Sequence, residues 1–127
     1  MLEEAITAWH VAVNRRDLNA ARATVTEPVD VLGPRGAGPI SAAEFAAWIT
    51  NSGIHLEPLS WHPVTHDTMV VEQEATWPGN AEADAAATPP IKVATLFRVR
   101  DGAISVIHRY SDLHDALRAA RPRSPTS

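Results

Sequence analysis

The sequence predicts an α+β fold in which a strongly curved, mostly antiparallel sheet carries three or more helices on its concave side. Helix-like segments are grouped early in the chain and strand-like segments late, which favours α+β over an alternating, parallel α/β fold. A two-residue hairpin signal, Asp101-Gly102, joins the last two strand-like runs. With 127 residues, the chain is one domain that can bury its own core.

Two helices are predicted at the start of the chain. Apolar residues recur there at spacings of three and four, the pattern of one helix face: Leu2, Ile6, Trp9 and Val13. Asp17 is placed to cap a second helix over residues 18–24, because its carboxylate can accept from the free amides of the first turn.

A strand, a loop and a third helix are predicted next. Pro28 disfavours helix before it, and the run Val29-Asp30-Val31-Leu32 favours a strand. Residues 33–39 are rich in glycine and proline and are predicted to form a loop. Ser41 and Glu44 have the spacing of a capping box, which indicates a helix beginning at this point.

The second half of the chain is predicted to form the sheet. Its strand-like runs are 55–65, 69–77, 91–100 and 103–111. Residues 81–90 are rich in alanine without apolar anchors, so we expect a flexible hairpin loop. A closing helix is expected over 113–120, giving a single domain over residues 1–120 and a flexible tail over 121–127.

Composition excludes several classes of function. The net charge is −4 and no basic cluster precedes the tail, so we expect no nucleic-acid partner. The absence of cysteine removes disulfides and thiolate sites. No apolar run approaches the roughly 20 residues of a membrane span, and the first residues lack a signal-peptide pattern. These observations predict a soluble, cytoplasmic protein without a membrane partner.

The stretch from Trp9 to Trp48, with its Arg16-Asp17-Leu18 turn, and the four strand-like runs that follow it resemble the nuclear transport factor 2-like superfamily. The resemblance is to its SnoaL-like polyketide cyclase and ketosteroid isomerase-like branch, and it extends to about Ala120. It implies a cystatin-like cone, a curved sheet around a pocket for a small apolar ligand. Because the fold is shared by enzymes and non-enzymes, it does not specify a reaction.

The resemblance also implies that the catalytic residues of the best-known relatives are absent. The tyrosine that donates to the oxyanion in ketosteroid isomerases falls on Trp9, and the aspartate base falls on Gly33. Limonene epoxide hydrolases use an Asp-Arg-Asp group on two neighbouring strands. Their Arg-x-Asp pattern looks most like residues 73–75 here, which are Gln-Glu-Ala, and their aspartate on the last strand falls on Arg109. Whether the protein is an enzyme therefore stays open.

We expect the pocket, from the resemblance and the strand alternation, to be lined by Trp9, Val13, Val31, Trp48, Gln73, Trp77, Ile107 and Arg109. The face of strand 91–100 that lines it stays open. Arg109 is its most informative member, because a guanidinium stays charged when buried and needs an anion. That anion is either a ligand group or a carboxylate of Glu72, Glu74 or Asp112.

Three hypotheses of function follow. The first is binding of a small apolar or weakly anionic molecule. The second is an isomerase, cyclase or dehydratase with an atypical acid–base set drawn from His10, His55, Gln73, Glu74 and Arg109. The third is a non-catalytic interaction domain. No cofactor is expected, and no metal, since Pro63 and the strand context break the helical i, i+4 geometry in which His62 and His66 could bind zinc.

A homodimer is also predicted. The family comparison places alternate residues of the last strand on the outer face of the sheet, and these form a largely apolar patch: Ile104, Val106, His108 and Tyr110. Such a patch would be covered if two sheets packed back to back.

Overall fold

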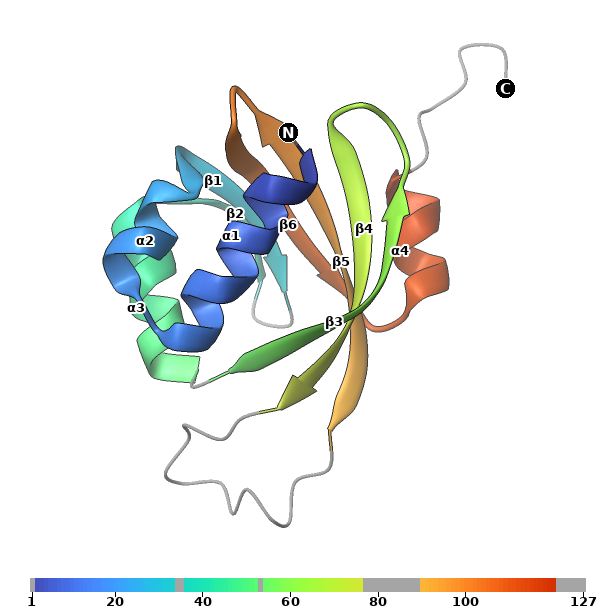
Figure 1. Cartoon of the computed structure of the whole chain (residues 1–127), viewed down its shortest axis with the longest axis horizontal. Coiled ribbons are helices and arrows are strands. Elements are labelled where there is room, and N and C mark those ends of the chain that lie inside the picture. The colour runs from blue at the N-terminus through green and yellow to red at the C-terminus, as the bar shows by residue number, and fades with distance from the viewer. Residues whose placement is uncertain (1, 34–35, 53, 77–89, 121–127) are drawn as a thin grey trace.

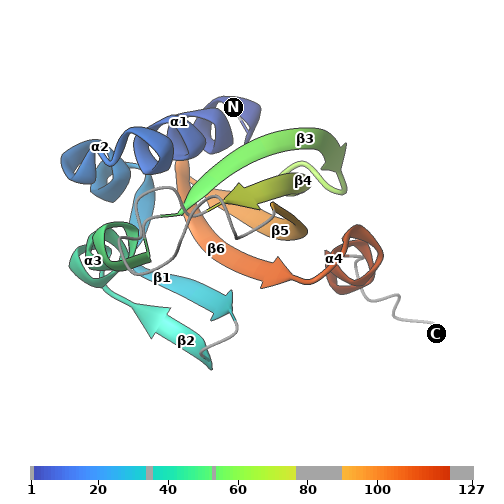
Figure 2. The same cartoon turned by 90° about the horizontal axis from the view of Figure 1, so that it is seen from below.

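The computed structural model describes residues 2–33, 36–52, 54–76 and 90–120. They form an α+β fold in which one six-stranded sheet curls around three helices, with a fourth helix on its other side (Figures 1 and 2). The helices are α1 (Leu2–Arg15), α2 (Leu18–Ala23), α3 (Ala42–Ser52) and α4 (Leu113–Ala120). The strands are β1 (Val25–Gly33), β2 (Gly36–Ile40), β3 (His55–Pro63), β4 (Thr68–Thr76), β5 (Ile91–Arg100) and β6 (Ala103–Tyr110).

The strands are arranged in the order β2-β1-β6-β5-β4-β3. Every neighbouring pair is antiparallel except β1 and β6, which are parallel. The predicted mixed, mostly antiparallel sheet is therefore confirmed. The strands bend strongly, so that the sheet has a concave face toward α1 and α3 and a convex face toward α4 (Figure 2).

The concave face carries the main core. Side chains of α1, α2 and α3 pack there against alternate residues of the central strands, among them Met69 and Val71 of β4 and Val93 and Phe97 of β5. Alternation places the intervening residues on the convex face, where Val70 of β4 packs with α4. The structure thus decides which face of β5 points toward the concave side.

Local signals were reliable guides to the turns and caps. The carboxylate of Asp17 accepts from the amide of Ala20, as the capping prediction requires. In the capping box, the Ser41 hydroxyl accepts from the Glu44 amide at 3.0 Å and the Glu44 carboxylate accepts from the Ser41 amide at 3.2 Å. Asp101 forms the predicted tight turn with a positive φ of 53°.

The prediction of a loop over 33–39 was wrong in its second half. Gly36–Ile40 forms β2, which pairs antiparallel with β1 at the edge of the sheet. Pro39 is compatible with this position because an edge strand has one side on which no amide is needed. β1 is also longer than predicted, since it extends over Val25–Gly33 and includes Pro28.

The predicted outer patch of the last strand needs one correction. Ile104 is fully buried in the concave core, because the pairing of β5 with β6 shifts between Arg98 and Val99. Val99 then pairs with Ile104 while Arg98 pairs with Val106. A register shift of this kind moves the side chains on one side of it to the opposite face of the sheet. Val106 and the residues after it keep the predicted face.

The closing helix forms where predicted but covers the convex face. Ala116 and Ala120 of α4 are buried against Val70, Ala94 and Leu96 of the sheet. The convex side is therefore partly occupied by the chain itself. The predicted loop over 81–90, apart from Pro90, and the predicted tail over 121–127 lie outside the described residues.

Candidate functional site

A chain of hydrogen bonds between buried polar side chains crosses the concave face of the sheet. It begins at His10 of α1, whose Nδ1 lies 2.8 Å from the Ile6 carbonyl oxygen. The His10 Nε2 lies 2.7 Å from the side-chain amide nitrogen of Gln73 on β4. The Gln73 side-chain oxygen accepts from the Thr95 hydroxyl of β5 at 2.7 Å.

The chemistry of the groups involved determines which atom donates in each of these three hydrogen bonds. A backbone carbonyl can only accept, so Nδ1 of His10 carries the proton and donates to Ile6. Nε2 then accepts from the Gln73 amide, and Gln73 accepts from Thr95. Both nitrogens of the neutral imidazole are used. His10 therefore acts as a fixed structural partner of Gln73 rather than as a free base.

Burial explains why His10 stays neutral. His10 is only 3% exposed, and the loss of hydration lowers the pKa of its imidazole from 6.5 to about 4. The hydrogen bond to Ile6 and the nearby carboxylate of Glu57 oppose this change by favouring the charged form. The desolvation cost is larger, so the imidazole is uncharged at neutral pH.

Arg109 lies on β6, the strand next to β5, where the chain of hydrogen bonds ends at Thr95. It is directly opposite Thr95 in the pairing of β5 with β6, and directly opposite side chains share one face of a sheet. Because Thr95 contacts Gln73 under α1, Arg109 is also on the concave face. Arg109 is half-buried, and burial lowers the pKa of its guanidinium.

Arg109 has no hydrogen bond or ion pair with any of the described residues. The three carboxylates that sequence analysis offered as partners are elsewhere. Glu72 is opposite Ala94 on the convex face and lies 3.5 Å from Ser60, and Asp112 caps α4. Glu74 follows the same alternation as Glu72 on β4. The structural ion pair predicted as one alternative is therefore not formed.

Trp9 contributes a second unpaired donor to this side of the sheet. Its indole is buried at 1% exposure, stacked on Phe45 with centroids 6.1 Å apart and edge-on to Phe97 at 4.9 Å. Among the described residues, its Nε1 has no hydrogen-bond partner. A buried N–H group without a partner is costly, and it calls for an acceptor.

The predicted pocket residues are found in two environments. Trp9, Val13, Gln73 and Ile107 are packed in the buried interior. Val31 and Trp48 are half-buried at the border of the concave core, as is Arg109 on β6. Trp77 lies outside the described residues.

The atypical acid–base set does not form one cluster. His10 and Gln73 are bonded to each other, and Arg109 shares their face. His55 instead lies 3.5 Å from the Glu57 carboxylate, and Glu74 is opposite Glu57 at the sheet edge. Sequence analysis did not single out Thr95. Its signal was a polar residue at an inward position whose neighbours on the same face, Val93 and Phe97, are apolar.

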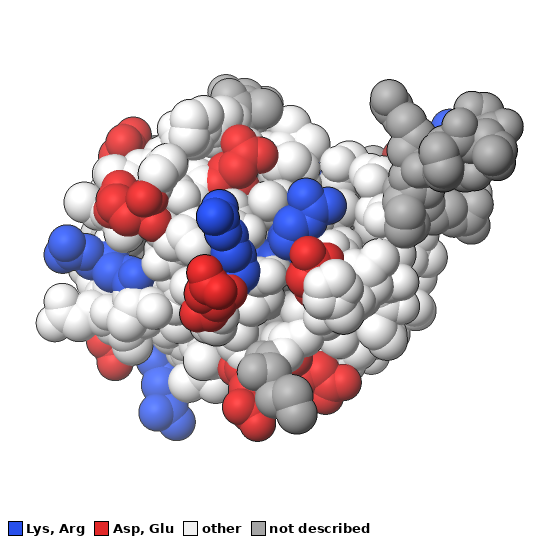
Figure 3. All heavy atoms as spheres, turned by 90° about the horizontal axis from the view of Figure 1, so that it is seen from above, with Lys and Arg blue, Asp and Glu red and all other residues white. Residues whose placement is uncertain are grey.

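Charge does not mark a further site on the face of the molecule shown in Figure 3. On the face shown in Figure 3, acidic and basic side chains are interspersed rather than gathered into one basic patch. Within the described ranges, no three histidine, aspartate or glutamate residues lie together as metal ligands would. None of the helices in the described part of the chain is long and apolar enough to cross a membrane.

The fold matches solved structures, although no family model and no curated protein is significantly similar in sequence. A nuclear transport factor 2-like protein of unknown function from Cytophaga hutchinsonii superposes with a TM-score of 0.73 at 14% identity, over 92% of this chain and 95% of that one. A protein with a ketosteroid isomerase-like fold from Catenulispora acidiphila, in complex with trimethylamine, gives 0.67 at 18%, over 98% and 100%.

A third similar structure is that of TerC co-crystallised with polyporic acid. It superposes with a TM-score of 0.69 at 19% identity, over 92% of this chain and 95% of that one. A cystatin-fold protein from Novosphingobium aromaticivorans is also similar. The chain therefore has the nuclear transport factor 2-like, cystatin-like fold that its sequence predicts.

Proposed function

We propose that this protein binds a small, largely apolar molecule that carries an anionic group, on the concave side of its sheet. The observation that carries the proposal is Arg109, a half-buried guanidinium on the concave face that lacks a partner among the described residues. Partial burial removes hydration from a charge that cannot be lost, and an anionic ligand would supply its counter-charge.

The chemistry of the surroundings supports this ligand class. The concave core is apolar and aromatic, with Trp9, Phe45 and Phe97 in contact. These three rings are fully buried, and the half-buried Val31 and Trp48 at the border of this core are the apolar surface that a ligand can reach. Small-molecule sites commonly combine apolar walls with a few polar groups. Two of the similar structures hold small molecules, polyporic acid and trimethylamine, which makes ligand binding a reasonable use of this fold.

An enzyme remains the second hypothesis, and one observation weighs against it. Acid–base catalysis needs a group that can exchange a proton near neutral pH. His10 has a pKa of about 4 and both of its nitrogens are hydrogen-bonded within the protein. The concave polar residues are thus better suited to hold a ligand than to move a proton.

Ligand binding can be tested by calorimetric titration with a panel of aromatic carboxylates, each paired with its neutral primary amide, and with polyporic acid. We expect the wild-type protein to bind at least one acid and to bind the matching amide more weakly. Arg109→Met should abolish binding of the acid, and Arg109→Lys should not restore it fully, because lysine lacks the paired N–H donors. Arg100→Met, at an exposed strand end, is the matched control.

Two results would contradict the proposal. One is equal affinity for acid and amide, because the guanidinium would then not recognise an anion. The other is a drop of several degrees in the melting temperature of Arg109→Met with or without ligand, which would make Arg109 a structural residue.

We also propose that two copies pair through the convex face. After the correction at Ile104, the half-buried Val106, His108 and Tyr110 remain on this face beside α4. His108 Nε2 lies 2.7 Å from a carboxylate oxygen of Asp30 on β1, so a hydrogen bond holds part of this surface. A stable dimer would bury on the order of 1,600 Å² in total.

A further inference from the structure

The protonation of His10 determines the direction of the hydrogen-bond chain on the concave face. Because Nδ1 of His10 donates to the Ile6 carbonyl, Nε2 accepts from the Gln73 amide, and the Gln73 oxygen is left to accept from Thr95. His10, Gln73 and Thr95 are only 3%, 0% and 2% exposed. Their polar groups therefore cannot exchange these partners for bulk water.

A proton on Nε2 of His10 would reverse the chain. Nε2 would then face a second donor, because the Gln73 amide nitrogen lies 2.7 Å away. Rotation of the Gln73 amide by half a turn removes this conflict, since its oxygen can accept from Nε2 while its nitrogen donates to the Thr95 oxygen. The Thr95 hydroxyl proton, which now points at Gln73, must then find another acceptor.

The position opposite Thr95 is occupied by Arg109 of β6. Directly opposite side chains lie on one face of the sheet, with their Cβ atoms about 5 Å apart. A guanidinium has only donors, so Arg109 itself cannot accept from Thr95. An anion paired with Arg109 has the lone pairs that a hydroxyl donor requires. The reversed chain therefore gains its missing acceptor when Arg109 holds an anion.

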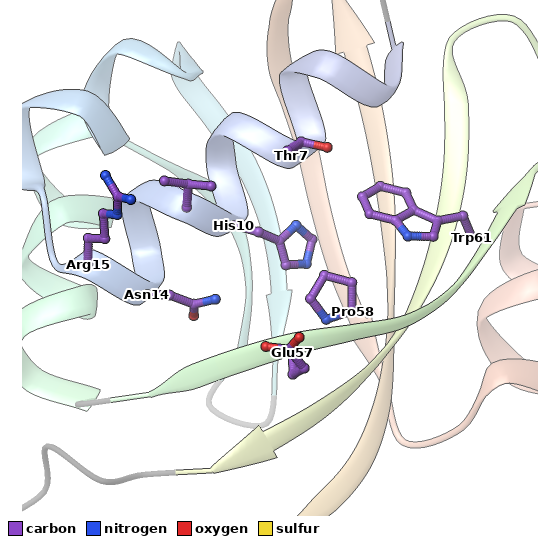
Figure 4. Close-up of a pocket in the computed structure, with 8 residues that line it drawn as sticks. Thr7, His10, Asn14, Arg15, Glu57, Pro58 and Trp61 are labelled. Carbon is purple, nitrogen blue, oxygen red and sulfur yellow. The ribbon is translucent and has the colours of Figure 1, made fainter.

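A groove between α1 and β3 brings solvent to the ring of His10. Figure 4 shows this ring between α1 and the strand, with Asn14 on the helix and Pro58 and Trp61 on β3. The ring centroid of Trp61 lies 5.9 Å from that of His10. A proton can therefore reach His10 from the groove, while Gln73 and Thr95 lie buried behind it.

The charges around His10 act in both directions. Glu57 of β3 favours the charged imidazole, but burial outweighs it and lowers the pKa of His10 to about 4. α1 itself carries Glu3 and Arg15. Arg109 of β6 opposes a second positive charge on the concave face, and a bound anion would cancel that repulsion. The side chains that β4 and β5 direct toward α1 are uncharged: Met69, Val71, Gln73, Ala75, Val93, Thr95 and Phe97.

We propose that an anion at Arg109 and a proton on His10 are coupled through this chain, so that the anionic ligand binds more tightly in mildly acidic solution. The inference rests on the proposed function, because it concerns the regulation of the same site. The coupling is reciprocal: an anion whose binding is strengthened by the proton also raises the pKa of His10. A rise of one pKa unit corresponds to about a tenfold gain in affinity at a pH below both pKa values.

The test is NMR observation of the His10 ring with and without p-toluenesulfonate, an anion that stays ionised in mild acid. At about pH 5, His10 of the free protein should be roughly one-tenth protonated. We expect saturating p-toluenesulfonate to raise this fraction to about half or more, and its affinity to increase about twofold or more between neutral pH and about pH 5. The signals of the exposed His114 should not respond.

The outcomes distinguish this inference from the proposed function. Binding of p-toluenesulfonate that is lost in Arg109→Met but leaves His10 unprotonated would overturn the coupling and leave the proposed function intact. Absence of binding at every pH would overturn both.

Thr95 variants test whether the coupling runs through the chain. Thr95→Val lacks the hydroxyl, so p-toluenesulfonate should bind to it at neutral pH without protonating His10 in mild acid, whereas Thr95→Ser should behave as the wild type. If the anion still protonates His10 in Thr95→Val, charge alone couples the two positions and the chain is not the route. The side-chain amide signals of Gln73 test the same point in the wild type: they should move as His10 becomes protonated, and fixed signals would overturn the reversal.

Discussion

Replacing His10 by glutamine should remove a pH-dependent part of the protein's stability. In the folded protein His10 has a pKa of about 4, whereas in the unfolded chain its pKa is near 6.5. Between these two values the unfolded chain binds a proton at this position and the folded protein does not. The free energy of unfolding therefore falls as the pH is lowered from 6.5 to about 4, and this contribution is fully present above pH 6.5.

The size of the effect follows from the two pKa values. One pKa unit corresponds to about 1.4 kcal/mol, so lowering the pKa from 6.5 to about 4 corresponds to roughly 3 kcal/mol of stability lost on acidification. Protonation would place an N–H on Nε2, where the Gln73 amide now donates, and would break that hydrogen bond. We therefore expect the loss of stability to accompany the breaking of the hydrogen bonds that link His10, Gln73 and Thr95.

Urea unfolding followed by tryptophan fluorescence, at pH values above 6.5 and near 4, measures this loss. Carboxylates also titrate in this range, so the informative quantity is the difference between wild type and His10→Gln. We expect the variant to be less stable at neutral pH but to lose roughly 3 kcal/mol less on acidification. His114→Gln, which changes an exposed histidine of α4, should behave as the wild type. Equal losses in wild type and His10→Gln would refute a buried neutral His10.

Three further predictions concern the edge strand, the isomerase reaction and the assembly. Asn14→Ala should destabilise the protein by roughly 1–3 kcal/mol in urea unfolding, because it unpairs the amide and carbonyl of Leu56; Asn19→Ala, on an exposed helix face, is the control, and equal effects would contradict the role of Asn14. If Gly33 and Trp9 occupy the base and donor positions, as the resemblance implies, isomerisation of a Δ5-3-ketosteroid should stay near the uncatalysed rate. Robust turnover would show the assignment to be wrong. Light scattering at micromolar concentration should give the mass of a dimer; a monomer mass would refute pairing through the convex face.

Local features of this fold could be predicted from the sequence because neighbouring residues determine them. Asp17 and the Ser41–Glu44 pair satisfy the free amides of a helix start regardless of what surrounds it. Asp101-Gly102 forms a tight turn between β5 and β6 for the same reason. Such signals predicted the starts of α2 and α3 and the last hairpin.

Features that depend on pairing between strands were not accessible in this way. β2 is rich in glycine and proline and becomes a strand only because β1 supplies its hydrogen bonds. The burial of Ile104 depends on a register shift in the pairing of β5 with β6, and no residue of β6 predicts that shift. The position of α4 on the convex face likewise depends on the alternation of the strands beneath it.

The candidate site shows the same division. Strand alternation correctly placed Arg109 on the concave face, since it needs only the period of two. The link from His10 through Gln73 to Thr95 requires α1 to lie over β4 and β5, which is a tertiary contact. A groove of about 300 Å³ between α1 and β3 was not predicted, because the residues that line it, Val11 and Trp61 among them, come from two elements far apart in sequence.

The most direct test of the central claim is the NMR signal of the Arg109 side-chain Nε–H, assigned through Arg109→Met, during titration with an aromatic carboxylate. We predict that this signal shifts and becomes protected from exchange as the acid binds, and that the matching amide leaves it unchanged. A carboxylate that binds the protein without moving the Arg109 signal would contradict the assignment of Arg109 as the anion anchor on the concave face.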